Sequence, residues 1–347
     1  MMSKNVNSID ICKFIMSICV VAIHIHPLAN CNNDLLLSVY NNLVSLAVPF
    51  FFTSTGYFLF HRMGDNLSGK EALNLLKMRI LQLFKVYIFW SVIYFPIALF
   101  YYFHDNHGFL FDLCDYIRKF LFTGSNHFST QFWYLLRLIY SLLLIYFLLR
   151  KKITVKVILA ISFVFYILGM FINYKIKMND MTGIFGNILK YFVSIFSQAK
   201  LLKSFLFVCL GGFISRIEFK KYINKTIFFF GLFGFGGICI GPKLLINEFI
   251  LPLEVIILFT FLLNFNIKDR KVYIILRSFS KIIFYTHMYF YFIYTLVSEK
   301  FTRLPPDGSM AFGIVLFLCM CVASLLLYLD KCTKNTKVNK LIALFIK

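Results

Sequence analysis

The feature that most constrains this chain is a run of about twenty predominantly apolar residues that recurs from near its first residue to near its last. A helix of about 20 apolar residues is long enough to cross the hydrocarbon core of a bilayer. The composition agrees, because 60% of the residues are hydrophobic and only 15% are charged, whereas soluble domains are about 45–50% apolar and about 25% charged. A soluble fold could not cover so much apolar surface with polar groups. The sequence therefore predicts an all-α, polytopic membrane helical bundle.

The apolar runs accommodate about ten transmembrane helices. Together they make residues 1–330 one transmembrane domain, followed by a short basic cytoplasmic tail, 331–347. The sixth and seventh spans are short and rich in glycine, and small residues let helices approach closely in lipid. The predicted spans are 11–29, 42–60, 83–103, 132–149, 153–171, 204–217, 226–241, 245–264, 279–297 and 311–329.

The basic residues set the predicted orientation. The net charge is +21, and 25 of the 36 lysines and arginines fall in alternate connections between the spans. Cytoplasmic loops carry the excess of lysine and arginine, so ten spans with both ends in the cytoplasm satisfy the pattern. We therefore expect a multi-pass protein of the inner cell membrane, with the lipid bilayer rather than nucleic acid as the partner that explains the charge.

Two predicted outer segments, 104–131 and 172–203, are long. Loops of this length are often functional lids or binding surfaces. The second segment has apolar residues at roughly helical spacing, which fits either a helix lying in the membrane interface or packing against the bundle. These residues are Ile184, Ile188, Phe192 and Ile195.

Polar residues follow one face of the first predicted span: Asp10, Lys13, Ser17 and His24. Lys13 and His24 differ by about 20° in direction and about 16 Å in height if the segment is helical. Charge in the hydrocarbon region is costly and marks function by default. We therefore interpret Lys13 as an anion-binding group at the cytoplasmic mouth and His24 as a deeper proton acceptor. Alternatively, Lys13 extends to the headgroups and His24 bonds a neighbouring helix.

Two further spans contain polar groups, and each group has two possible interpretations. In the second span, Thr55, Gly56 and Tyr57 follow a proline, and this pattern predicts either a loosened helix that exposes backbone donors to a ligand or a packing kink. In the ninth span, Tyr285 and His287 could serve a proton relay or bond across helices.

A third group begins the fourth span on its predicted outer side. It contains Gln131, Trp133 and Arg137. Aromatic residues at this level are typical of the interfacial belt. Arg137 lies deeper, where an arginine needs a partner or an aqueous cavity.

Taken in order, these motifs resemble the acyltransferase-3 family of integral membrane acyltransferases. The family pattern has an aspartate, an arginine and, 11 residues after the arginine, a histidine; Asp10, Lys13 and His24 occupy those places. The family's Phe-Phe-x-x-Ser-Gly-aromatic stretch is matched by residues 51–57, with Thr55 in place of serine. The resemblance covers nearly the whole chain.

The later motifs match more loosely. The family's basic entrance to the third helix is matched by residues 79–87, and its His-x-Trp-Phe-Leu by residues 131–135 with Gln131 for histidine. The family's late Tyr-x-x-His is matched less well, because one residue rather than two separates Tyr285 from His287. Gln131 cannot exchange protons, and a lysine in place of the first arginine lacks the bidentate fork. These departures also fit a member that binds without catalysing.

The resemblance implies a membrane O-acyltransferase. It would move an acyl group, expected to be acetyl, from cytoplasmic acyl-CoA to a hydroxyl of an extracytoplasmic glycan or lipid-linked sugar, with no permanently bound cofactor and no metal. His24 is then the catalytic base, with Asp10 in the same catalytic group. Lys13, Arg79 and Lys85 would hold the coenzyme A phosphates. The residues expected to support substrate or structure are Thr55, Gly56, Tyr57, Gln131, Trp133, Arg137, Tyr285 and His287.

The sequence is also similar to the membrane portion of the membrane-bound serine racemases of vancomycin resistance. That portion is thought to supply serine to a fused racemase, so transport of a small solute such as serine is the alternative function. A non-catalytic membrane subunit is a third. The printed chain ends 18 residues after the last predicted span, at 330–347, and on that ground we expect acyl transfer.

Overall fold

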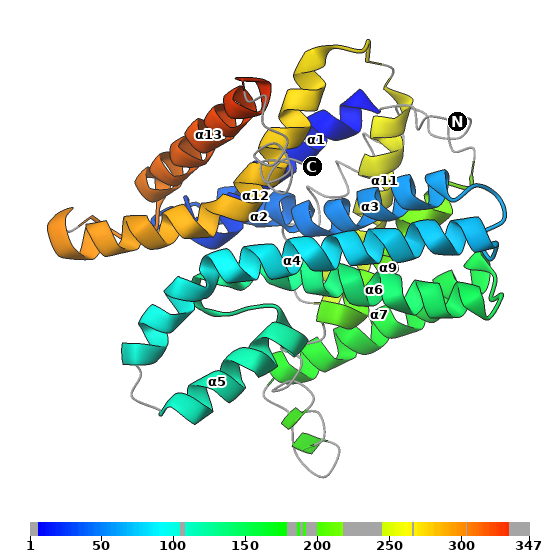
Figure 1. Cartoon of the computed structure of the whole chain (residues 1–347), viewed down its shortest axis with the longest axis horizontal. Helices are drawn as coiled ribbons and strands as arrows, with labels where there is room; N and C mark the ends of the chain where they lie inside the picture. Colours follow the sequence, from blue (N-terminus) through cyan, green and yellow to red (C-terminus); the bar gives the residue numbers. More distant parts are fainter. Residues whose placement is uncertain are drawn as a thin grey trace. The chain divides into compact units, whose positions relative to one another are not determined.

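The structure is a computed structural model that describes residues 6–104, 108–178, 186–187, 190–191, 200–217, 245–265, 267–302 and 304–332. These residues are helical or lie in turns and connections, and no strand occurs among them (Figure 1). The all-α prediction is therefore confirmed. The described residues fall into two compact units: one within Pro49–Phe261, the other within Asn5–Val48 and Leu262–Lys347.

The first unit is built around α6 (Trp133–Arg150), which packs against both α4 (Lys70–His104) and α9 (Lys200–Ile214). The helix α7 (Val155–Lys177) packs in turn against α9. The remaining elements of this unit are α3 (Ala47–Arg62), α5 (Phe109–Arg118), η1 (Lys119–Thr123), η2 (His127–Phe132) and α11 (Leu245–Asn264). The first two residues of α3 and the last three of α11 belong to the second unit.

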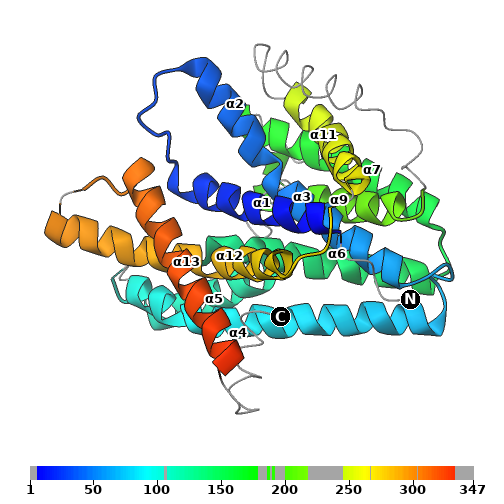
Figure 2. The ribbon, with the colours of Figure 1, turned by 90° about the horizontal axis from the view of Figure 1, so that it is seen from above.

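The second unit is built around α12 (Lys271–Val297), which packs against α1 (Asn7–Ile25) and α13 (Ser309–Cys332) (Figure 2). Its other helices are α2 (Asp34–Ser45) and the short η4 (Ser298–Thr302). The helix α1 ends where His26 adopts a left-handed conformation, with φ of 48°, and Pro27 follows. The core between the helices is apolar and is formed by Val21, Ile25, Ile283, Tyr294, Ala311, Val315 and Cys319.

Apolar surface faces outward from several of these helices. Val92, Val164 and Phe317 are each more than 60% exposed, which is unfavourable in water but suits contact with lipid chains. Within the described part of the chain, six segments are long and apolar enough to cross a membrane, so the chain is a multi-pass membrane protein. They are Asn7–Ile25, Asp34–Arg62, Lys70–His104, Phe109–Arg150, Val155–Ile176 and Ser309–Cys332.

The total of ten spans and the cytoplasmic location of both ends stay predictions. The seventh predicted span, 226–241, lies outside the described residues. So do the four residues of the predicted interfacial helix: Ile184, Ile188, Phe192 and Ile195.

The helices α3 and α9 approach each other through glycines. A Cβ atom added to Gly56 would collide with the carbonyl oxygen of Val208, and one added to Gly211 would collide with that of Thr53. A Cβ on Gly212 would lie 2.9 Å from the ring of Phe60. The predicted close approach at the glycines of the sixth span is therefore confirmed for this pair of helices.

Replacing Gly211 with alanine is expected to lower the thermal unfolding temperature of the purified protein, since overpacking a tight contact costs about 1–3 kcal/mol. The control is Gly313→Ala in α13, where, beyond the adjoining residues and backbone of the helix itself, no described atom lies within 4 Å of the added Cβ. Alanine is favoured over glycine in helices, so Gly313→Ala should unfold at the wild-type temperature or above it. Equal behaviour of the two variants would contradict the close approach.

Candidate active site

The helices α1 and α12 run in the same direction and exchange polar contacts along their length (Figure 2). Near the start of both helices, the Asn7 Nδ2 donates to the carbonyl of Ile267 at 3.0 Å and to Asp269 Oδ1 at 2.6 Å. Further along both helices, the Ser280 hydroxyl donates to the carbonyl oxygen of Lys13 at 2.9 Å. These bonds fix the register between the two helices, and the polar face predicted for α1 therefore faces α12.

Asp10 forms an ion pair with Arg277 of α12. The Arg277 Nε donates to Asp10 Oδ1 at 3.0 Å and Nη2 donates to Oδ2, so the contact is bidentate. The side chain of Asp10 is 2% exposed and that of Arg277 is 35% exposed. Asp10 also lies in the first turn of α1, where the helix dipole favours a negative charge. An acid in this buried position is stable because it is paired.

His24 meets His287 further along the same two helices. Their ring centroids are 5.3 Å apart. His287 is fully buried, and its Nδ1 lies 3.0 Å from the carbonyl of Ile283. Because a carbonyl only accepts, Nδ1 carries the proton and neutral His287 keeps its lone pair on Nε2. Among the described residues, nothing hydrogen-bonds this buried Nε2.

The structure separates the predicted catalytic pair Asp10 and His24. They are 14 residues apart on one helix, which is about 21 Å of rise, and Asp10 bonds Arg277 instead. Asp10 therefore does not orient His24. Tyr285 is two residues from His287, or about 200° around α12, so it does not share the histidine's face.

The predicted coenzyme A contacts are divided between the two units. Lys13 is partly exposed in α1 of the second unit. Arg79 and Lys85 belong to α4 of the first unit, where Arg79 Nη1 donates to Gln82 Oε1 at 2.9 Å and Lys85 is exposed. A joint role of the three in binding phosphate stays a prediction.

In the first unit, Gln131 and Arg137 form a buried polar region at the start of α6. Gln131 is 1% exposed, and within the described part of the chain neither of its amide atoms, both buried, has a hydrogen-bond partner. Arg137 is fully buried two turns later. Trp133 presents its ring to the Lys200 ammonium, which lies 5.0 Å from the ring centroid. These groups have the polarity expected of a site within the first unit.

Thr55, Gly56 and Tyr57 lie in an unbroken part of α3. The Thr55 hydroxyl donates to the carbonyl of Phe51 at 3.0 Å, and the Tyr57 ring stacks on His61 with centroids 5.9 Å apart. Together with the tight contact at Gly56, this arrangement favours a packing role over an exposed set of backbone donors. None of these contacts involves a substrate, so the role of the three residues in supporting substrate stays a prediction.

Sequence reasoning missed the role of Arg277, which falls in the connection between the predicted spans 245–264 and 279–297. The helix α12 begins at Lys271 rather than at the predicted residue 279, so Arg277 lies on a helix beside Asp10. A usable signal was present, because an acid inside a predicted span requires a cationic partner.

Comparison with known proteins identifies the family. The acyltransferase domain model of the acyltransferase-3 family matches residues 6–329. The chain belongs to the acyltransferase-3 family. The resemblance predicted from the motifs is therefore confirmed, and the family match extends over nearly the whole chain.

Two curated relatives from Enterococcus faecalis are each named amino-acid racemase. One is 26% identical over 290 residues, covering 82% of this chain and 37% of the relative. The other is 27% identical over 244 residues, covering 67% of this chain and 32% of the relative. This acyltransferase-3 chain thus spans about a third of the length of the relatives it matches. No solved structure matches it.

Proposed function

We propose that this chain transfers an acyl group, expected to be acetyl, from cytoplasmic acyl-CoA to a hydroxyl of an extracytoplasmic glycan or lipid-linked sugar. The observation that carries the proposal is the pair His24 and His287, whose rings lie 5.3 Å apart on the two helices that also pair Asp10 with Arg277. The charged pair of Asp10 and Arg277 lies near the start of these helices, and the two histidines lie further along. This order suits a donor that has an anionic head at one end and a reactive group at the other.

In the proposed reaction, the acceptor hydroxyl attacks the thioester carbonyl of acyl-CoA. A C–O bond forms as the C–S bond breaks, and the thiolate of coenzyme A leaves. His24 takes the hydroxyl proton during the attack and returns it to the thiolate. The buried Nε2 of His287 would accept a hydrogen bond from the N–H of His24 and so hold the His24 ring in place during the transfer.

Lys13 is the proposed anchor for the phosphates of coenzyme A at the predicted cytoplasmic end of α1. It lies 11 residues before His24, which is about 16 Å of helix. The pantetheine arm of coenzyme A is long enough to bridge a distance of this order. The family membership supports acyl transfer, and the separation along α1 supports a donor that enters from the cytoplasmic side.

Coenzyme A and acetyl-CoA are expected to raise the unfolding temperature of the purified protein in detergent. A ligand at about 100 times its Kd adds about 2.7 kcal/mol to the free energy of unfolding. Lys13→Ala should lose most of this stabilisation. The control is Lys331→Ala, an exposed lysine at the end of α13 in the same unit, which should retain it. Equal loss in both variants would indicate only unspecific attraction between charges.

Transport of a small solute such as serine is the second candidate. It is favoured by the two relatives named amino-acid racemase. Uptake of labelled serine into vesicles that contain the protein but no acyl donor separates the candidates. Saturable uptake that is indifferent to coenzyme A supports transport, whereas no uptake together with stabilisation by coenzyme A supports acyl transfer.

A further inference from the structure

The helix α11 carries two acids inside a long apolar sequence. It coincides with the predicted span 245–264 and contains Glu248 near its start and Glu254 midway between its ends. A residue midway along this helix lies about 15 Å from either end. The hydrocarbon core of a bilayer is about 30 Å thick. Glu254 is therefore placed near the middle of the membrane, where charge is most costly.

The first of the two acids, Glu248, is paired within the first unit. Lys203 Nζ of α9 lies 2.8 Å from Glu248 Oε1. The Tyr166 hydroxyl of α7 donates to the backbone carbonyl of Glu248 at 2.5 Å. That carbonyl lacks its usual helical donor, because Pro252, four residues later, has no N–H. The start of α11 thus has both its charge and its open carbonyl satisfied by neighbouring helices.

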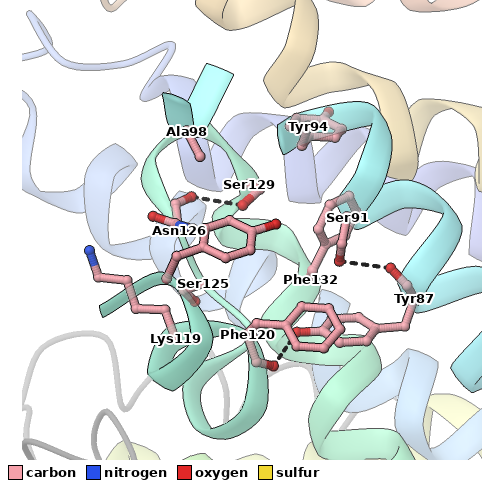
Figure 3. A pocket seen from close by; sticks show the side chains of 12 residues that line it. Tyr87, Ser91, Tyr94, Ala98, Lys119, Phe120, Ser125, Asn126, Ser129 and Phe132 are labelled. Carbon is pink, nitrogen blue, oxygen red and sulfur yellow. Dashed lines mark hydrogen bonds between the residues drawn. The ribbon is translucent and has the colours of Figure 1, made fainter. Parts of the chain in front are cut away.

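Hydroxyl groups of the same unit are bonded within the protein in the same way. In the region shown in Figure 3, the Tyr87 hydroxyl donates to the carbonyl of Phe120 at 2.6 Å, and the Ser91 hydroxyl donates to that of Tyr87 at 2.8 Å. The Ser129 hydroxyl donates to the carbonyl of Asn126 at 2.9 Å. Polar groups that are removed from water are normally satisfied by such partners.

Glu254 differs from these groups. Among the residues that the structure describes, no hydrogen bond or ion pair reaches its carboxyl group. Glu254 lies six residues after Glu248 and so points about 120° away from it, whereas Lys203 contacts Glu248. The side chains one turn before and one turn after Glu254 are apolar, so α11 itself offers no neighbouring cation. They are Ile250, Leu251, Ile257 and Leu258.

The titratable groups that α3, α7 and α9 direct toward α11 contact other residues. Tyr166 and Lys203 bind Glu248. From α3, the Tyr57 ring stacks on His61 and meets Phe259 with ring centroids 5.2 Å apart. Phe259 lies about 140° around α11 from Glu254. The groups on these three helices therefore leave the carboxyl of Glu254 uncompensated.

We propose that Glu254 is a proton-binding site within the membrane, where its carboxyl group takes up and releases a proton reversibly. A carboxylate without a partner in hydrocarbon is far less stable than the neutral acid, and a proton needs no cavity. Glu254 is partly exposed, which leaves a path for exchange. The acyl transfer proposed above returns the acceptor's proton to coenzyme A and does not use this site. The inference therefore rests on neither candidate function.

Infrared spectroscopy of the full chain in lipid tests the proposal, because a protonated carboxyl and a carboxylate absorb at different frequencies. At neutral pH, Glu254→Gln should lose one protonated-carboxyl band that the wild-type protein shows. The matched control is Glu71→Gln in the first turn of α4, where the side chain is exposed. An exposed glutamate is ionised at neutral pH, so this variant should keep the band. The wild-type band should fall when the pH is raised and return when the pH is restored.

Dicyclohexylcarbodiimide, a lipophilic reagent, provides a second measurement. The acid proton passes to one nitrogen of the reagent and the carboxyl oxygen bonds its central carbon. The O-acylisourea then rearranges to a stable N-acylurea. At neutral pH, mass spectrometry should find this adduct at Glu254, and at alkaline pH it should find less. Glu248, which is paired with Lys203, and the exposed Glu71 should carry little of it.

Stability distinguishes an unpaired acid from a paired one. Glu254→Leu should unfold at the wild-type temperature or above it, because leucine is more stable than an acid in hydrocarbon. Glu248→Leu should unfold at a lower temperature, because it removes the partner of Lys203.

Equal protonated-carboxyl bands in the folded wild-type protein and in Glu254→Gln would overturn the proposal, whatever the carbodiimide labels. A band that persists at strongly alkaline pH would overturn it too, since the carboxyl would then hold its proton permanently. A loss of stability in Glu254→Leu as large as that in Glu248→Leu would reveal a partner for the acid and would also reject the site. Stabilisation by coenzyme A, measured on the same variants, reports on acyl transfer separately.

Discussion

Replacing His24 with asparagine is expected to abolish acyl transfer while the protein stays folded. Asparagine keeps the polarity of the position but cannot take a proton, and a general base contributes about 10²–10⁴-fold to a rate. The partner ring of His287 is fully buried, so it is poorly placed to substitute for His24. The measurement is transfer of labelled acetyl from acetyl-CoA to envelope glycan in vesicles whose cytoplasmic face is open to the donor.

The control for this experiment is His26→Asn, two residues away. His26 is exposed and has φ of 48° at the end of α1, a conformation that asparagine tolerates well. The same substitution should therefore leave both the fold and the activity unchanged. Full activity in His24→Asn, with wild-type unfolding temperature, would remove His24 from the reaction. Loss in both variants would indicate damage to the end of α1.

Much of the fold follows from hydropathy alone. The predicted span 245–264 coincides with α11, and the span 132–149 differs from α6 by one residue at each end. Hydropathy does not predict the ends of a helix that continues past its apolar stretch, because charged turns lower the apolar average. For that reason α4 and α12 begin earlier than predicted, at Lys70 and Lys271. Short helices such as α5 are too polar and too brief to be detected.

The candidate site was predictable in part. The helical period brought Lys13 and His24 to one face of α1, and that face packs against α12. The partners of this face were not predictable, because Arg277 and His287 are more than 260 residues away in sequence and no local pattern pairs them with Asp10 and His24.

Replacing Arg277 with alanine is expected to destabilise the protein strongly. It would leave the carboxylate of Asp10, which is 2% exposed, buried without its bidentate partner. Removing one member of a buried ion pair costs about 3–5 kcal/mol. Because a third of the Arg277 side chain is exposed, we expect the lower end, about 3 kcal/mol. The measurement is thermal unfolding in detergent, with Arg118→Ala as control, since its partly exposed pair with Asp115 contributes about 0–1 kcal/mol.

The double variant Asp10→Asn with Arg277→Gln separates structure from function. Two amides of similar shape can hydrogen-bond without leaving a buried charge, so the double variant should recover most of the stability lost in Arg277→Ala. If Arg277 serves only to neutralise Asp10, the double variant should also keep its stabilisation by coenzyme A. Loss of that stabilisation in a well-folded double variant would instead make Arg277, with Lys13, part of the donor's phosphate site. If Arg277→Ala lowered the stability no more than Arg118→Ala does, that result would contradict the buried ion pair of Asp10 and Arg277.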